Sequence, residues 1–122
     1  MAATPYSAHL RRGEDMSYDL QTLAMLVDAR LRHSPLVSMT SLAADMGVHR
    51  HTIGRAIKLR FGMTFATLRE QYLAKAIEES LSGSPLKSIK VVAEQIGFGS
   101  ATALARASRR VIGQAPTGIR RK

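Results

Sequence analysis

The sequence predicts an all-α fold of about seven helices, in which a long central helix joins two helix-turn-helix subdomains. Two observations predict it. A motif occurs twice, as LAADMGVHRHTIGRAIKLRFG at residues 42–62 and as VAEQIGFGSATALARASRRVIG at residues 92–113. Apolar residues outside the motif recur at helical spacing, and no segment shows the period of two that is typical of a strand.

The two copies of the motif carry small and basic residues at matching positions. Each has an Ala four residues before a Gly, where the small side chain lets another helix cross closely and the Gly ends a helix by adopting a positive φ. A second helix follows at once, as in a helix-turn-helix. Gly47 and Gly97 lie 50 residues apart, whereas Arg55 and Arg106 lie 51 apart, so the second turn is predicted to be one residue longer.

The first lobe is predicted to span residues 17–63, after a flexible N-terminal arm at residues 1–16. An amphipathic helix at about residues 18–32 is indicated by an apolar stripe, which consists of Leu20, Leu23, Ala24, Val27 and Leu31. Thr40 or Ser41 is predicted to cap a helix that runs to Met46. The helix after the turn is predicted at about residues 50–61.

A linker helix is predicted at residues 64–82, with Thr64 as its N-terminal cap. Its buried stripe would consist of Phe65, Leu68, Tyr72, Ala76, Ile77 and Leu81. The run SGSP at residues 82–85 is expected to end this helix.

The second lobe, with a basic tail, is predicted at residues 83–122. Ser88 is expected to cap a short helix that reaches Gln95. Ser100 should start the next helix, which runs to about Val111, and Pro116 should open a final turn.

The charge of the chain indicates a polyanionic partner. Of 18 basic and 9 acidic residues, residues 1–34 hold four of each, so the net charge of +9 lies in the repeat region. Such an excess points to nucleic acid first and to an anionic membrane second, with simple solubility as the alternative. The absence of Cys excludes disulfides, thiolate zinc sites and Cys nucleophiles. With no signal-peptide pattern and no run of eighteen apolar residues, we expect a cytoplasmic, nucleoid-associated protein outside the membrane.

The helix after each turn is predicted to carry a basic face. At 100° per residue, one side of the first helix is apolar and the other carries Arg50, His51, Gly54, Arg55 and Lys58. The second helix likewise separates an apolar side from a side with Thr102, Ala105, Arg106 and Arg109. Neither helix contains an acid, which favours a phosphate-facing surface over a merely solvated one.

Side-chain chemistry assigns a role to each residue on these faces. Arg55 and Arg106 lie near the middle of the two helices, and a guanidinium can bond guanine O6 and N7 together. The residues expected to reach base edges are His51, Gly54, Arg55, Thr102, Ala105 and Arg106. Those expected to contact phosphates are Arg50, Lys58, Ser100, Arg109 and Arg110. Gly54 either weakens its helix by about 1 kcal/mol relative to Ala or lets the backbone approach DNA closely.

Over about residues 18–121 the chain resembles the AraC/XylS family of transcription regulators. The resemblance rests on the run from Ala43 through GMTF at residues 62–65, on IGF at residues 96–98, and on GQAP at residues 113–116 followed by Arg120. It implies that both recognition helices enter successive major grooves of promoter DNA, that a monomer suffices for binding, and that contact with RNA polymerase activates transcription. The seventeen residues before the first helix are too few for an effector pocket, so a stand-alone regulator or the DNA-binding end of a longer one is expected.

Several residues depart from the family pattern. Ile57 and Leu104 stand where aromatic residues are expected, and the Arg usual in the connecting helix is replaced around Tyr72 and Leu73. His49 stands where Ser or Thr would cap the first recognition helix.

Ser108 stands on the apolar side of the second helix, where an aromatic residue is expected. One interpretation is that its hydroxyl donates to the carbonyl of Leu104, one turn back. The other is that the second lobe is less rigid than the first and is stabilised by DNA.

Other functions find less support in the sequence. His49 and His51 are two residues apart, about 200° on a helix, so we expect no metal site, and no motif indicates a cofactor. No Ser nucleophile or cleft accompanies the His residues, so we expect no enzyme. Two alternatives to sequence-specific DNA binding remain: a module that docks on RNA polymerase without reading bases, and a basic membrane-surface protein, which the lack of aromatic anchors on the basic faces disfavours.

Overall fold

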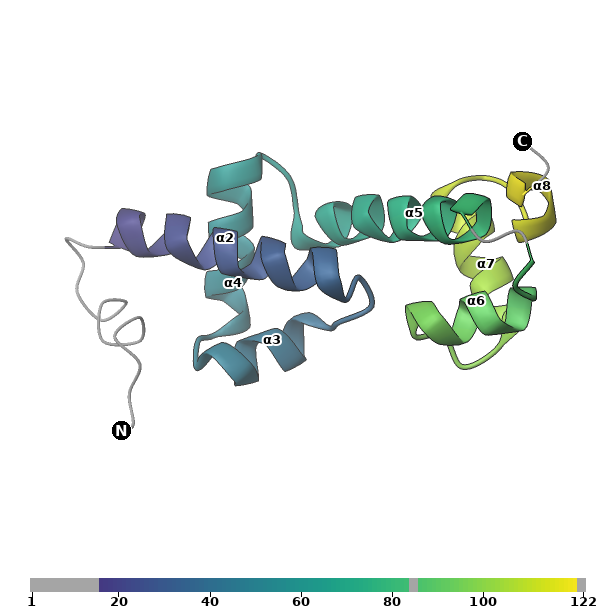
Figure 1. Cartoon of the computed structure of the whole chain (residues 1–122). Coiled ribbons are helices and arrows are strands. Elements are labelled where there is room, and N and C mark those ends of the chain that lie inside the picture. The colour runs from purple at the N-terminus through teal and green to yellow at the C-terminus, as the bar shows by residue number, and fades with distance from the viewer. Residues whose placement is uncertain (1–15, 84–85, 121–122) are drawn as a thin grey trace. The chain divides into compact units, whose positions relative to one another are not determined.

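The computed structural model describes the backbone of residues 16–83 and 86–120 and, within them, the side chains from Asp19 onward. This part of the chain forms seven helices and no strand (Figure 1), so the all-α prediction is confirmed. The helices are α2 (Met16–His33), α3 (Met39–Met46), α4 (Arg50–Phe61), α5 (Phe65–Gly83), α6 (Ile89–Ile96), α7 (Ala101–Val111) and α8 (Pro116–Arg120). The arm predicted at residues 1–16 lies outside the described residues, except for Met16, which begins α2.

The chain divides into two compact units, and the boundary falls inside α5 after Leu68. The first unit holds α2, α3, α4 and the first turn of α5. The second unit holds the remainder of α5, α6, α7 and α8, together with Ser34–Leu36 from the α2–α3 loop. Arg69 ties that loop to its unit, because its Nε donates to the carbonyl of Pro35 at 3.1 Å and its Nη2 donates to that of Leu36 at 3.4 Å.

The core of the first unit forms where α4 crosses α2 (Figure 1). The apolar stripe predicted for α2 is buried along its whole length, at Leu20, Leu23, Ala24, Val27 and Leu31. Leu42 of α3 and Ile53 of α4 are also fully buried. Burial of a Leu or Ile side chain stabilises the fold by about 1.5–3 kcal/mol, so these contacts fix which face of α4 remains outside.

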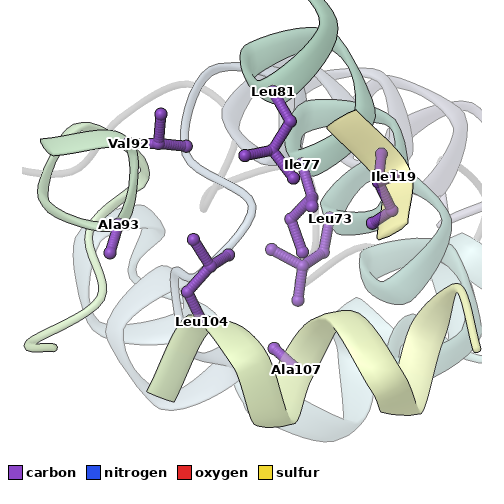
Figure 2. Close-up of a cluster of buried hydrophobic side chains, with 8 residues drawn as sticks. All are labelled: Leu73, Ile77, Leu81, Val92, Ala93, Leu104, Ala107 and Ile119. Atoms are coloured by element: carbon purple, nitrogen blue, oxygen red, sulfur yellow. The ribbon is translucent and has the colours of Figure 1, made fainter. Parts of the chain in front are cut away.

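The core of the second unit gathers one or two residues from each of its shorter helices around α5 (Figure 2). Leu73, Ile77 and Leu81 project from α5. They meet Val92 and Ala93 of α6, Leu104 and Ala107 of α7, and Ile119 of α8. Packing of α7 against α6 and α8 leaves its opposite face exposed.

The predicted stripe of α5 is partly wrong. Phe65, Leu68, Ile77 and Leu81 are buried, but Leu73 is buried where Tyr72 and Ala76 are only half-buried. The reason is that Leu68 belongs to the first unit and the helix after it to the second, so α5 buries one face in each unit rather than a single stripe. The predicted cap is present, since Thr64 Oγ1 accepts from the Thr67 N–H at 3.1 Å.

The cap predicted for α3 is also wrong. The helix begins at Met39, and Ser38 is the N-cap, with Oγ accepting from the Ser41 N–H at 3.0 Å. Ser38 has the extended backbone that an N-cap requires, whereas Thr40 and Ser41 already lie inside the helix. The predicted caps Ser88 and Ser100 are both observed.

The repeat includes one helix more than the sequence motif. Buried residues of α2 and α5 correspond at an offset of 50, as Leu23 with Leu73, Val27 with Ile77, and Leu31 with Leu81. Ser38 and Ser88 cap α3 and α6 at the same offset. Each repeat therefore consists of a supporting helix followed by a helix-turn-helix.

Candidate nucleic-acid interface

The two helix-turn-helix motifs have the predicted turns. Residues 47–49 connect α3 to α4, and residues 97–100 connect α6 to α7, so the second turn is one residue longer. Gly47 and Gly97 end the preceding helices with φ of 69° and 118°, a conformation that costs other residues free energy. Each turn thus determines where the second helix of its motif, α4 or α7, begins on the core of its own unit.

The buried faces of α4 and α7 coincide position by position. Ile53, Ala56 and Ile57 are buried in α4, and their counterparts 51 residues later, Leu104, Ala107 and Ser108, are buried in α7. The predicted separation of each helix into an apolar and a basic side therefore agrees with the burial. Val111, predicted on the apolar side, is half-buried near the end of α7.

The predicted base-contacting residues lie opposite these buried faces. His51 and Arg55 are exposed on α4, and Thr102 and Arg106 are exposed on α7. The small residues just before each Arg, Gly54 and Ala105, are half-buried. Apart from the adjacent residues and the backbone of its own helix, a Cβ added at Gly54 would meet no atom within 4 Å, so Ala would fit there in the free protein.

On the first unit the basic residues border an open hollow. Its lining combines three predicted base-contacting residues and two predicted phosphate-contacting residues with His49 and Met39, namely Met39, His49, Arg50, His51, Gly54, Arg55 and Lys58. Met39 was not predicted to lie here, and its place follows from the start of α3 one residue after Ser38. The hollow contains no acidic side chain.

Most of the side chains predicted to contact DNA have no intramolecular partner in the part of the protein that the structure describes. Within the described residues, no hydrogen bond or ion pair joins the side chains of Arg55, Lys58, Arg106 or Arg109 to another residue. Exposed guanidinium and ammonium groups in this state carry their full charge toward solvent. Such groups attract phosphate strongly and non-specifically.

Arg110 differs from these residues because it forms an ion pair. Its Nε donates to Glu70 Oε2 at 3.2 Å. Glu70 lies on α5, forty residues earlier in the chain, and no sequence signal singled it out. Ser100, another predicted phosphate contact, is exposed and uses its Oγ to accept from the Ala103 N–H at 3.1 Å.

His49 acts as the N-cap of α4 in place of a Ser or Thr. Its Nδ1 accepts from the His51 N–H at 3.1 Å. Because His49 lies before the helix, the 200° separation expected for His49 and His51 does not describe them, and their ring centroids are 6.5 Å apart. One ring nitrogen of His49 is thus committed to the backbone.

The interpretation of Ser108 as a bond to the carbonyl of Leu104 is wrong. Ser108 is fully buried, and its Oγ donates to the carbonyl of Gln114 in the turn before α8. A buried hydroxyl needs such a partner, because an unpaired one costs about 1–3 kcal/mol. Ser108 thereby ties α7 to the segment that follows it.

Comparison with known proteins agrees with this architecture. A sequence model described as a helix-turn-helix domain matches residues 42–122. The fold is similar to the C-terminal domain of AraT, a response regulator from Geobacillus stearothermophilus, with a TM-score of 0.68 and 20% sequence identity over 84% of this chain and 83% of that one. No curated protein shows a significant match. None of the helices in the described ranges is long and apolar enough to cross a membrane.

Proposed function

The chain belongs to the AraC-type helix-turn-helix family of DNA-binding transcription regulators, and on that premise we propose that it binds double-stranded DNA in a sequence-specific manner. The observation that carries this proposal is the matched pair of basic faces. Arg55 and Arg106 occupy equivalent, exposed positions on α4 and α7, and neither helix contains an acid.

Arg55 and Arg106 read bases in this proposal. A guanidinium placed over a guanine makes two hydrogen bonds, to O6 and N7, and such a contact discriminates against a wrong base by about 1–3 kcal/mol. Neighbouring base edges are touched by His51 and Thr102, which lie one turn before these arginines, and by Gly54 and Ala105, which directly precede them.

Lysine and arginine residues toward the ends of the helices bind the DNA backbone. The exposed Lys58 and Arg109 occupy equivalent positions and have no partner among the described residues. Arg50 and Ser100 lie at the starts of α4 and α7, where backbone N–H groups also favour a phosphate. These contacts hold the helices in place without reading sequence.

The two helices enter successive major grooves of promoter DNA. One chain with two reading helices binds as a monomer, and bound chains contact RNA polymerase and activate transcription. This role places the protein in the cytoplasm with the nucleoid. No step requires a cofactor, a catalytic residue or a membrane.

Selection of bound sites from a random duplex library tests the proposal. The expected motif has two boxes about one helical turn apart, one for each recognition helix. A single box would overturn two-groove binding. If no motif is selected, and Arg55→Ala and Arg106→Ala tested singly leave promoter occupancy unchanged, the chain instead docks on RNA polymerase without reading bases.

A further inference from the structure

The ion pair between Arg110 and Glu70 alters the charge that α7 offers to DNA. Arg110 is 57% exposed and Glu70 is 50% exposed, so both groups are accessible from solvent. The pair uses Nε of the guanidinium and one carboxylate oxygen at 3.2 Å. Ion pairs this exposed contribute little to folding, because water screens them.

Arg110 lies close to the base-reading residue of its helix. Four residues of helix turn the chain through about 40° beyond a full circle, so Arg110 is one turn after Arg106 and nearly in line with it. A phosphate beside the Arg106 contact is therefore within the reach of Arg110. The carboxylate of Glu70 would then also be near that phosphate.

The charges of the pair oppose each other at such a site. In water, two unit charges 4 Å apart interact by about 1 kcal/mol, about a fivefold change in affinity. Repulsion between Glu70 and the phosphate is of the same order as the attraction by Arg110, so the intact pair adds almost nothing to binding. A neutral pair also displaces no counterion from DNA.

The internal repeat supports this interpretation. Arg55 and Lys58 of α4 correspond to Arg106 and Arg109 of α7, all basic and exposed. The residue of α4 that corresponds to Arg110 is Leu59, which is 50% exposed and uncharged. With Glu70 in place, both helices present the same net charge at these three positions.

We propose that Glu70 is a positioning residue that limits the DNA affinity of the second lobe by holding Arg110 in an internal ion pair. This inference rests on the proposed function. It predicts that the protein carries a latent phosphate contact, which a single neutral substitution releases.

The test uses the full chain and its selected duplex, with dissociation constants measured by fluorescence anisotropy from 50 to 200 mM salt. Glu70→Gln should tighten binding on the order of fivefold at low salt. The plot of log affinity against log salt should become steeper by about 0.9, so the gain falls about threefold across this range. Arg110→Ala alone should weaken binding on the order of fivefold, because it leaves the repulsion between Glu70 and the phosphate uncompensated.

The decisive variant combines both substitutions, because it removes both opposing charges and should bind about as tightly as the wild type, without the gain that Glu70→Gln produces alone. Glu78→Gln is the matched control, since Glu78 is an exposed carboxylate on the same helix with no partner among the described residues. It should give a smaller gain that is independent of Arg110. The ¹⁵N resonance of Arg110 Nε should shift on Glu70→Gln in the free protein, which checks the ion pair directly.

Two results would overturn the inference. A double variant that binds as tightly as Glu70→Gln would mean that the carboxylate merely repels DNA and that Arg110 adds nothing. A loss of affinity in Glu70→Gln would mean that the carboxylate supports Arg110 at the phosphate. If the wild type binds DNA normally and either result is obtained, only the role proposed for Glu70 is rejected, and the proposed function stands. A wild-type chain that does not bind duplex DNA rejects the proposed function.

Discussion

Substitution of Gly54 separates a requirement for close DNA approach from a simple weakness in α4. The Cβ added by Gly54→Ala would meet no atom within 4 Å, so the change introduces no clash in the free protein. Glycine in a helix interior costs about 1 kcal/mol relative to Ala. The free energy of unfolding should therefore rise by about 1 kcal/mol, which for a protein of this size raises Tm by about 3–6 °C.

The same methyl group should weaken DNA binding if the backbone of α4 lies against the bases. We expect a loss on the order of tenfold, equivalent to about 1.4 kcal/mol. Unfolding followed by circular dichroism and binding followed by anisotropy measure the two effects separately. The unusual combination of a more stable protein and weaker binding is the expected signature.

The repeat supplies a control for this experiment. Ala105 occupies the position in α7 that Gly54 occupies in α4. Ala105→Gly should lower the free energy of unfolding by about 1 kcal/mol, which confirms that the propensity effect applies to both helices. If Gly54→Ala stabilises the protein and leaves DNA affinity intact, the argument for close approach at Gly54 is refuted.

Three further predictions concern other parts of the site. Lys58→Ala should weaken binding to all duplexes alike and reduce the salt slope by about one, and a change in base preference in the site selection would contradict its role at phosphate. Ser108→Ala should cost about 1–3 kcal/mol in urea unfolding, because it removes the hydrogen bond from the buried Ser108 hydroxyl to the Gln114 carbonyl; an unchanged midpoint would show that this bond is dispensable. Amide protons of residues 88–122 should exchange faster than those of the first lobe without DNA, and equal protection would reject the idea of a softer second lobe.

Much of the fold follows from periodicity in the sequence. Apolar spacing predicts α2, and the repeated motif with Gly47 and Gly97 predicts the turns and the helices that follow them, because local chemistry determines these features. The repeat also implies the cap at Ser38, since Ser38 lies 50 residues before Ser88, which the sequence predicts to be a cap.

The features that the sequence does not predict depend on contacts between residues far apart in the chain. The pairing of Arg110 with Glu70 joins α7 to α5, and the bond from Ser108 to the Gln114 carbonyl depends on how the chain turns after α7. Leu73 is buried in place of Tyr72 because α5 passes from one unit into the next after Leu68. A helical wheel contains no information about such tertiary partners.

Site selection repeated with Arg55→Ala and with Arg106→Ala tests the reading of bases most directly. Each variant is predicted to lose base preference at one position of one box, with a cost there of about 1–3 kcal/mol, and to keep the other box intact. If both variants select the wild-type motif with unchanged preference at every position, these two arginines do not read DNA sequence.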